Sequence, residues 1–316
     1  MLLLSVALAQ TAPPIVNGST TKDFIQVGAL MAYSSQGGAS FCSGTLIHEE
    51  WVMTAAHCNV AAKEYDRAGY DVLFVWGSNL GTNSGIEGYM AVDEILVHPD
   101  YDDRALQFDF GLLHLEEPVT EIEPMPVNRE PVDNSWKGRQ IDFVGWGITS
   151  DNRNDSGVKR TAQMPVYDLY GDSVFRAYDS QQNLCSGDSG GAGLEPQDGG
   201  GYELAGINSY VFAVQSQNST CVGGGSGSGR VDVALEWVES HVILEEDPFD
   251  FEVAGVDSAY VDTGDPLAPT TSGVKPAGGC STGGGAAGWT LIALAGLLWR
   301  PRRRSLASPA AGPLRG

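Results

Sequence analysis

Short apolar runs punctuated by turn residues fill the chain between Ile15 and Ile243, and this pattern restricts the fold more than any other feature. Alternation of apolar and polar residues over a few positions is typical of strands with one buried face. The abundance of glycine (41) and the small charged fraction (18%) also favour a loop-rich all-β structure. The runs are Phe24–Val27, Thr45–Ile47, Asp71–Val75, Ile95–Val97, Gly111–Leu115, Ile141–Val144 and Leu204–Ile207. The sequence therefore predicts an all-β sandwich or barrel.

One helix is predicted at the end of this region, from Val231 to Ile243. Leu235, Val238 and Val242 recur at spacings of three and four residues, which places them on one helical face. We expect this helix to cap the domain by packing.

The first nine residues are apolar and end in Ala7-Leu8-Ala9, a small-x-small pattern. This ending is typical of a signal-peptide cleavage site, so residues 1–9 are predicted to be a signal peptide. A buried N-terminal strand is the alternative interpretation. In an exported protein, the five cysteines would form two disulfides and leave one odd residue.

The C-terminal part divides by composition. Residues 244–279 are acidic, then rich in Pro, Gly, Ser and Thr, and are predicted to be a disordered linker. Residues 280–304 contain Cys280, a glycine spacer, an apolar stretch predicted to be a short tail helix, and an arginine cluster, and residues 305–316 are predicted to be disordered. The apolar stretch is shorter than the ~20 residues of an ordinary spanning helix. A soluble core helix is the alternative there.

The formal net charge of −22 excludes one class of partner. A nucleic-acid-binding protein needs a basic stripe that displaces counterions, and the chain has none. We therefore expect no nucleic acid partner.

The glycine-rich segment Leu184–Gly191 is the strongest chemical signal in the chain. It places Ser189 between glycines and beside Asp188. Glycines let the backbone fold tightly enough to aim amide N–H groups at a point next to a hydroxyl. That arrangement suits acyl transfer, in which the hydroxyl attacks a carbonyl and the amides stabilise the oxyanion. Most Gly-Ser runs are flexible loops, however, so the assignment depends on partners elsewhere.

Two residues elsewhere in the chain could activate the Ser189 hydroxyl. His57 lies beside a cysteine in Thr54–Cys58, and Asp109 starts the strand-like run to Leu113. A neutral serine hydroxyl is a poor nucleophile near pH 7, so both a base and an acid are needed. The matching segments are Thr54–Cys58, Asp109–Leu113, Gly187–Gly191, Ile15–Gly18, Phe41–Leu46, Val97–Tyr101 and Gly145–Gly147. Together, and in their order along the chain, they closely resemble the chymotrypsin/trypsin family of serine endopeptidases.

The resemblance covers about Ile15 to Ile243 and implies a protease domain over residues 15–243. Its expected fold is all-β: two six-stranded antiparallel β-barrels with a C-terminal helix and the active site between the barrels. Its substrates would be proteins or peptides. By the family template, Ser189 would be the nucleophile, His57 the general base and Asp109 the group that orients the imidazole. The backbone N–H groups of Gly187 and Ser189 would form the oxyanion hole.

The resemblance also implies activation by cleavage and two disulfides. The new N-terminus at Ile15 would insert and pair with Asp188, which makes residues 10–14 a short propeptide. Pro14 stands where a trypsin-activated precursor would have Lys or Arg, so a different protease would be needed. The implied disulfides are Cys42–Cys58 and Cys185–Cys221.

The family's specificity pocket corresponds to Asn183 at its floor, Ser209-Tyr210-Val211 along one wall and Ser226 on the opposite wall. Asn183 is not the aspartate that would attract Lys or Arg, and Val211 would narrow the opening. We expect a preference for small or medium uncharged side chains before the scissile bond.

The tail resembles the sorting signals called MYXO-CTERM, over about Cys280 to Arg304. The resemblance implies export, recognition by a sorting or processing protease, and attachment to the cell surface or release after cleavage near Cys280. Membrane contact would occur only through this tail. A simple membrane anchor with a free thiol is the alternative.

Other functions remain as alternatives. Gly187–Gly191 also fits the G-x-S-x-G motif of serine esterases. That fold needs the order Ser, acid, His along the chain and a helix directly after the serine. His241 is the only histidine after Ser189, and it lies in the predicted closing helix. A catalytically inactive homologue acting as a surface binding module is the other alternative. No cofactor is expected and no metal-ligand spacing occurs, although family analogy allows calcium in the loop from Asp71 to Glu87.

Overall fold

The computed structural model describes residues 15–214 and 220–244, and all of these belong to one compact unit. The predicted signal peptide, propeptide, sorting tail and C-terminus, with Cys280, lie outside the described residues, as does all of the linker after Leu244. None of the described helices is long and apolar enough to cross a membrane.

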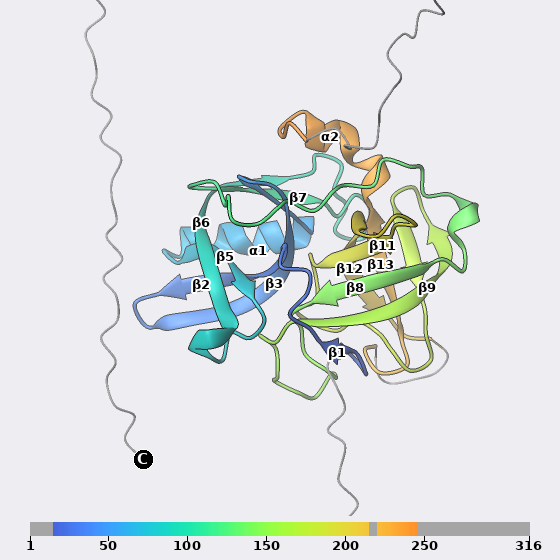
Figure 1. The fold of residues 1–316 in the computed structure, drawn as a ribbon, viewed down its shortest axis with the longest axis horizontal. Helices are drawn as coiled ribbons and strands as arrows, with labels where there is room; N and C mark the ends of the chain where they lie inside the picture. The colour runs from blue at the N-terminus through green and yellow to red at the C-terminus, as the bar shows by residue number, and fades with distance from the viewer. Residues whose placement is uncertain (1–14, 215–219, 245–316) are drawn as a thin grey trace, which may run out of the picture. The chain divides into compact units, whose positions relative to one another are not determined.

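Two six-stranded antiparallel β-barrels make up the fold, which confirms the predicted architecture (Figure 1). The first barrel closes in the order β2-β3-β4-β7-β6-β5, and the second closes through β8, β9, β10, β13, β12 and β11. The first contains β2 (Val27–Ser34), β3 (Gly37–His48), β4 (Trp51–Thr54), β5 (Asp71–Gly77), β6 (Ile86–Val97) and β7 (Gly111–Leu115). The second contains β8 (Gln140–Gly145), β9 (Arg160–Tyr170), β10 (Val174–Ala177), β11 (Ala192–Pro196), β12 (Tyr202–Phe212) and β13 (Gly225–Arg230), and β1 (Ser19–Thr20) pairs with β9.

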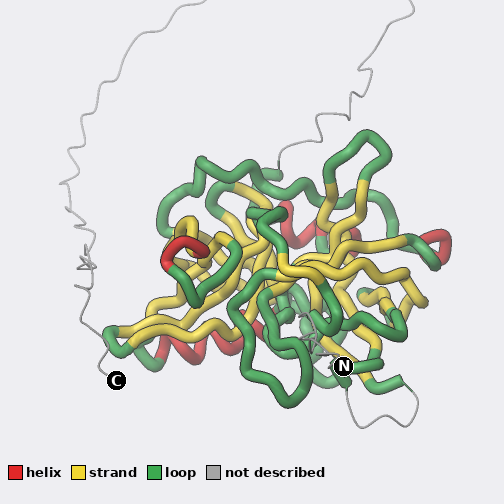
Figure 2. The backbone as a smooth tube through the Cα atoms, turned by 60° about the horizontal axis from the view of Figure 1, so that its bottom comes forward, coloured by secondary structure: helices red, strands yellow, loops and turns green. Residues whose placement is uncertain are grey.

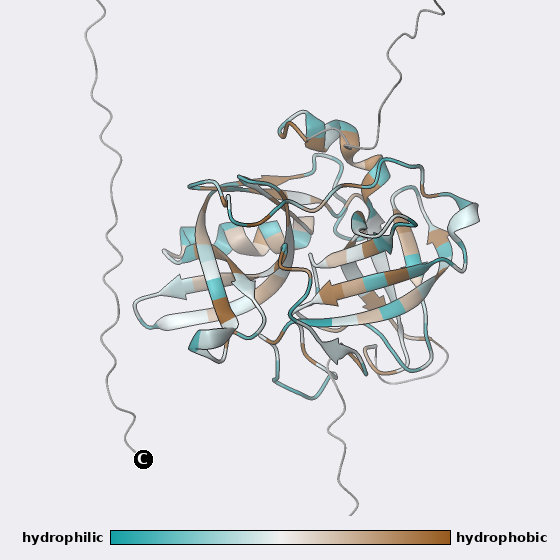
Figure 3. Cartoon of the chain, in the orientation of Figure 1, coloured by the Kyte–Doolittle hydropathy of each residue, from teal (hydrophilic) through white to brown (hydrophobic). Residues whose placement is uncertain are grey.

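Apolar residues are frequent along the strands of both barrels (Figure 3), and strands such as β5 are buried at consecutive positions. Phe74 and Leu113 are among the fully buried side chains of the first barrel, and Phe143 and Phe175 are among those of the second. The indole N–H of Trp146, just after β8, donates to the Val27 carbonyl at 3.2 Å and so joins the two barrels.

One predicted strand is mostly wrong. Phe24–Gln26 form a turn, and β2 begins only at Val27. Phe24 has a positive φ of 53°, and its carbonyl accepts hydrogen bonds from the Val27 N–H and from the Lys159 ammonium, each at 2.9 Å. A buried lysine far along the chain thus stabilises a turn that local alternation cannot reveal.

The helices also differ in extent from the prediction (Figure 2). The expected helix at the end of the domain is shorter, with the 3₁₀ turn η3 (Val231–Val233) followed by α2 (Leu235–Glu239). A longer helix, α1 (Ala56–Arg67), packs against β5, β6 and β7 and was not predicted. Two further 3₁₀ turns are η1 (Asn83–Gly85) and η2 (Asn134–Trp136). Helix α1 is important because His57 is its second residue.

Candidate active site

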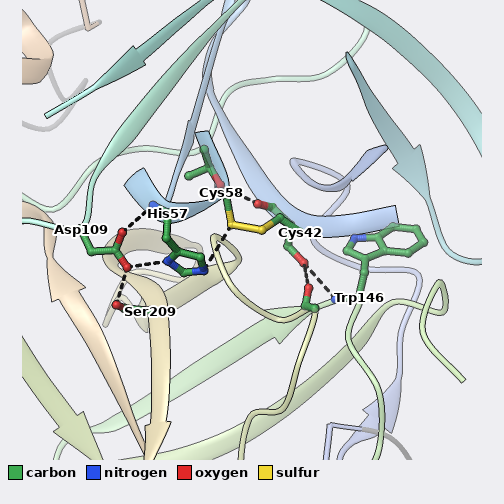
Figure 4. Close-up of a disulfide and its surroundings, with 9 residues drawn as sticks. Cys42, His57, Cys58, Asp109, Trp146 and Ser209 are labelled. Atoms are coloured by element: carbon green, nitrogen blue, oxygen red, sulfur yellow. Dashed lines mark hydrogen bonds and ion pairs between the residues drawn. A yellow bond between two sulfur atoms is a disulfide. The ribbon is translucent and has the colours of Figure 1, made fainter. Parts of the chain in front are cut away.

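The His57 imidazole is held by a buried carboxylate, Asp109 (Figure 4). His57 Nδ1 lies 2.8 Å from Asp109 Oδ2, and the His57 backbone N–H donates to Oδ1 at 2.9 Å. The Ser209 hydroxyl donates to Oδ2 at 2.5 Å. Sequence reasoning assigned Ser209 only to the pocket wall, because nothing in its motif indicated this bond across the barrels. The carboxylate therefore fixes both the backbone and the ring of His57.

The charge of Asp109 determines which nitrogen of His57 is basic. Burial raises the pKa of Asp109, but hydrogen bonds and charge from His57, together with the Ser209 hydroxyl, outweigh it and leave the pKa below its ordinary value. An ionised carboxylate can only accept, so Nδ1 carries the proton and Nε2 keeps its lone pair. The arrangement can therefore take a proton at Nε2 and stabilise the resulting imidazolium.

Helix α1 is fixed firmly enough to hold the imidazole. It starts directly after extended Ala55, and the buried Asn59 amide donates to the Leu96 carbonyl at 2.6 Å and the Leu112 carbonyl at 3.0 Å. The disulfide between Cys42 on β3 and Cys58 on α1 adds a covalent connection. Three neighbouring strands thus position the first turn of α1.

The Ser189 loop belongs to the second barrel but is bound to β3 of the first by Ser43. The Ser43 N–H donates to the Ser189 carbonyl at 2.8 Å, and its hydroxyl donates to the Gly187 carbonyl at 2.9 Å. The same hydroxyl accepts the Trp146 N–H at 3.1 Å. Sequence reasoning had placed Ser43 in a matching segment without assigning it a role, because a buried serine carries no local signal of its partners.

The backbone of this loop leaves two donors available. Gly187 has φ +94°, a conformation that favours glycine, and an added Cβ would lie 2.9 Å from the Gly147 Cα. Within residues 15–214 and 220–244, the N–H groups of Gly187 and Ser189 donate to no backbone or side-chain acceptor. Two such donors beside a hydroxyl can bind an oxyanion.

The structure brings Ser189 close to the first barrel without a hydrogen bond to His57 among the described residues. The His57 Nε2 lies 3.6 Å from Cys58 Sγ. The next residue, Gly190, is packed so tightly that an added Cβ would lie 2.0 Å from Thr54 Oγ1, two residues before α1 begins. Serine–histidine bonds are often long before substrate binds, so the missing bond does not exclude this pair.

Asp188, beside the nucleophile position, is a buried carboxylate with two backbone donors. The Gly147 N–H donates to Oδ1 at 2.8 Å and the Cys185 N–H to Oδ2 at 2.9 Å. Burial raises the pKa of Asp188 to about 7, although these hydrogen bonds and the charge of Arg160 lower it. Ile15 is fully buried in the core of the second barrel, and the Val16 N–H donates to the Asn183 carbonyl at 2.9 Å.

The predicted pocket residues lie together on adjacent elements. Val211 on β12 pairs with Ser226 on β13, and the Asn183 amide donates to the Thr220 and Cys221 carbonyls at 3.0 and 3.1 Å. The second disulfide, Cys185–Cys221, links the same segments. Tyr210 lies between Ser209 and Val211 on β12 and is partly exposed.

Cavity size alone does not locate the site. A cavity of about 220 Å³ lies beside the first disulfide, lined by Phe41, Cys42, Trp146 and Gly187 among others. A larger groove of about 920 Å³, with Arg139 and Glu195 in its lining, contains none of the predicted site residues. The lining of the smaller cavity includes Gly187, one of the two candidate oxyanion donors, but not His57 or Ser189.

The proposed calcium loop is a poor donor set. Between Asp71 and Glu87, only these two end residues carry a carboxylate, whereas calcium in proteins takes about 6–8 oxygen ligands. The Gly85 carbonyl already accepts from the N–H groups of Ser78 and Asn79, and the Asn79 amide oxygen accepts from the Gly81 N–H. These residues do not fit calcium. Elsewhere in the described chain, Cys42, His57 and Cys58 lie close enough for a metal, but both sulfurs are in a disulfide.

Comparison with known proteins places this geometry in context. A family model described as Trypsin matches residues 15–237. Chymotrypsin-like elastase family member 1 of Macaca fascicularis is 27% identical over 232 residues, which cover 62% of this chain and 85% of that protein. A trypsin of Saccharopolyspora erythraea is 31% identical over 188 residues, covering 58% of this chain and 78% of that protein. The family match includes every strand of both barrels.

Proposed function

Because the chain belongs to the trypsin family and is a serine endopeptidase, we propose that His57, Asp109 and Ser189 form its catalytic triad. The observation that carries the proposal is the buried Asp109 carboxylate, which binds His57 Nδ1 at 2.8 Å and leaves Nε2 as the base. The Ser43 hydrogen bonds support it, because they hold the Ser189 loop against β3.

Catalysis would proceed in two steps through an acyl-enzyme. The Ser189 hydroxyl attacks the peptide carbonyl as His57 Nε2 takes its proton, and the N–H groups of Gly187 and Ser189 stabilise the oxyanion. The imidazolium then protonates the leaving amine, and the peptide bond breaks. In the second step, water attacks the ester as His57 accepts its proton, and the imidazolium then gives that proton to Ser189 Oγ as the acyl C–O bond breaks.

The activity of Ser189 can be tested with a fluorogenic peptide. We expect Ser189→Ala to lower kcat by about 10⁴-fold or more, because triad members act as a unit. Ser84→Ala, at an exposed serine remote from the site, is the matched control and should retain activity. A folded wild type that binds peptides without turnover would favour the inactive homologue, and hydrolysis of esters without peptides would favour an esterase.

The substrate preference proposed is for small or medium uncharged side chains before the scissile bond. Asn183 carries an amide and no charge, and Val211 on β12 and Ser226 on β13 are register partners on adjacent strands. A peptide library should show cleavage after such residues. Strong cleavage after Lys or Arg would contradict this preference.

Maturation is proposed to cut Pro14–Ile15, so that the Ile15 ammonium pairs with Asp188. The burial of Ile15 and the need of a buried carboxylate for a cation support this step. The two disulfides support export to an oxidising compartment. Sorting of the tail near Cys280, with surface attachment or release, is proposed from the sequence alone.

A further inference from the structure

Asp188 lacks an N-terminal ammonium in the intact chain, because Pro14 precedes Ile15. Its carboxylate is 1% exposed, and its two hydrogen bonds come from the neutral backbone groups of Gly147 and Cys185. A buried carboxylate is costly without a compensating positive charge. In the intact chain, another positive charge is therefore needed to stabilise the ionised Asp188 in the Ser189 loop.

Arg160, the first residue of β9, lies on the other side of the Gly147 peptide. Its Nη1 donates to the Gly147 carbonyl at 3.1 Å, while the Gly147 N–H donates to Asp188 Oδ1 at 2.8 Å. Gly147 thus lies between the guanidinium and the carboxylate, which contact the two peptide units on either side of its Cα. The two bonds are on different amides, so the attraction between the charges acts through space, and the low dielectric of the interior strengthens it.

Arg160 forms no direct ion pair among the described residues. Its side chain is 4% exposed and donates to three neutral carbonyls, those of Gly147, Val158 and Asp155. The acids that attract it electrostatically are Asp155 and Asp188. The charge of this desolvated guanidinium, which has only neutral hydrogen-bond acceptors, therefore acts on Asp155 and on Asp188.

The neighbouring buried base does not share this role. Lys159 donates from Nζ to the Phe24 carbonyl at 2.9 Å, and the acids that attract it are Glu87 and Asp23. Arg160 is therefore the basic side chain of the described residues whose charge acts on Asp188.

We propose that Arg160 is a built-in counter-charge for Asp188, acting across Gly147, and that it gives the chain proteolytic activity before Pro14–Ile15 is cut. Arg160 is a positioning residue in this role, because it orders the loop that carries the Gly187 and Ser189 donors. The inference rests on the proposed function. Cleavage then adds a second cation, the Ile15 ammonium, and raises activity from this basal level.

The test compares cut and uncut forms of the full chain. Pro14→Lys allows trypsin to release Ile15, and N-terminal sequencing and mass spectrometry before and after the assay identify each form. Activity on a fluorogenic peptide is measured at pH 8 for the parent chain and for its Arg160→Gln and Arg160→Lys variants. Arg139→Gln is the matched control, since Arg139 belongs to the same barrel and pairs with Glu195 away from the loop.

We expect the uncut chain to be active, and Arg160→Gln to lower its kcat about tenfold or more, with KM changed less. In the cut form the loss should be below about threefold, because the ammonium replaces the missing charge. Arg160→Lys should remain within about fivefold of the parent in both forms, because it keeps the charge. Arg139→Gln should leave the ratio of uncut to cut activity unchanged.

Two results would overturn the proposal. One is an uncut parent without activity beside an active cut form, a comparison that needs no Arg160 variant and holds even if Arg160→Gln does not fold. The other is an equal loss in cut and uncut Arg160→Gln. If folded parent chain is inactive in both forms, the proposed function itself fails.

Discussion

Asp188 illustrates how burial of one carboxylate can set the response of the protein to pH. In the uncut chain its pKa is raised from 3.8 to about 7 by burial. Between these values the unfolded chain releases the proton that the folded chain keeps, so the unfolded state binds fewer protons. The free energy of unfolding must therefore fall as pH rises through this window.

The measurement is urea unfolding of the uncut chain with Ser189→Ala, which prevents self-digestion. We expect the free energy of unfolding to fall by up to about 1.4 kcal/mol per pH unit between pH 4 and 7, relative to the same chain with Asp188→Asn. The difference between the two chains isolates Asp188 from other titrating groups. A difference independent of pH would mean that the carboxylate is ionised throughout and that its pKa is not raised.

Gly190 shows at the level of elements how the serine loop and the first barrel fit together. It has φ +78°, and an added Cβ would lie 2.0 Å from Thr54 Oγ1 and 2.3 Å from the Ser43 carbonyl. Gly190→Ala must therefore push the loop away from β3 and β4. A displacement of about 1 Å at a catalytic group can cost about 10²-fold, and we expect a loss of that order in kcat/KM.

The matched control is Gly199→Ala in the turn between β11 and β12, where an added Cβ meets nothing within 4 Å. It should stay within about twofold of wild type, as surface substitutions usually do. Circular dichroism and thermal unfolding would separate a displaced loop from a general loss of fold. Full activity in a folded Gly190→Ala variant would show that the loop tolerates this displacement and that the close packing is not needed.

The elements also show what the sequence alone could predict. Strands such as β5 and β12 follow from short apolar runs between turn residues, and both are buried at consecutive positions, so on both faces. Helix α1 was missed because it begins without a side-chain N-cap hydrogen bond and directly after a strand. The sequence motifs indicated His57, Asp109 and Ser189 as candidates. They did not indicate the Ser43 hydrogen bonds or the placement of Arg160, since both depend on contacts between segments more than a hundred residues apart or on buried charge.

At the scale of the whole molecule, the candidate site combines parts of both barrels. His57 and Asp109 come from the first barrel, while Ser189 and the Ser209 hydroxyl that binds Asp109 come from the second. The barrels are joined at the same place by Ser43 and Trp146. Correct geometry at the site thus depends on how the barrels dock, and not on either barrel alone.

The overall charge affects which peptides reach that site. From Ile15 to Ile243 the chain has 12 Lys and Arg against 32 Asp and Glu, so a negative field surrounds the protease domain. Such a field raises the encounter rate of cationic substrates, and salt screens it over a Debye length of about 10 Å at 0.1 M. We expect kcat/KM for a peptide carrying lysines away from the scissile bond to fall several-fold between low and high salt. A neutral peptide with the same residues around the bond is the control and should change less. Equal salt dependence of the two peptides would show that the net charge does not guide substrates, and that selection depends on contacts within the cleft alone.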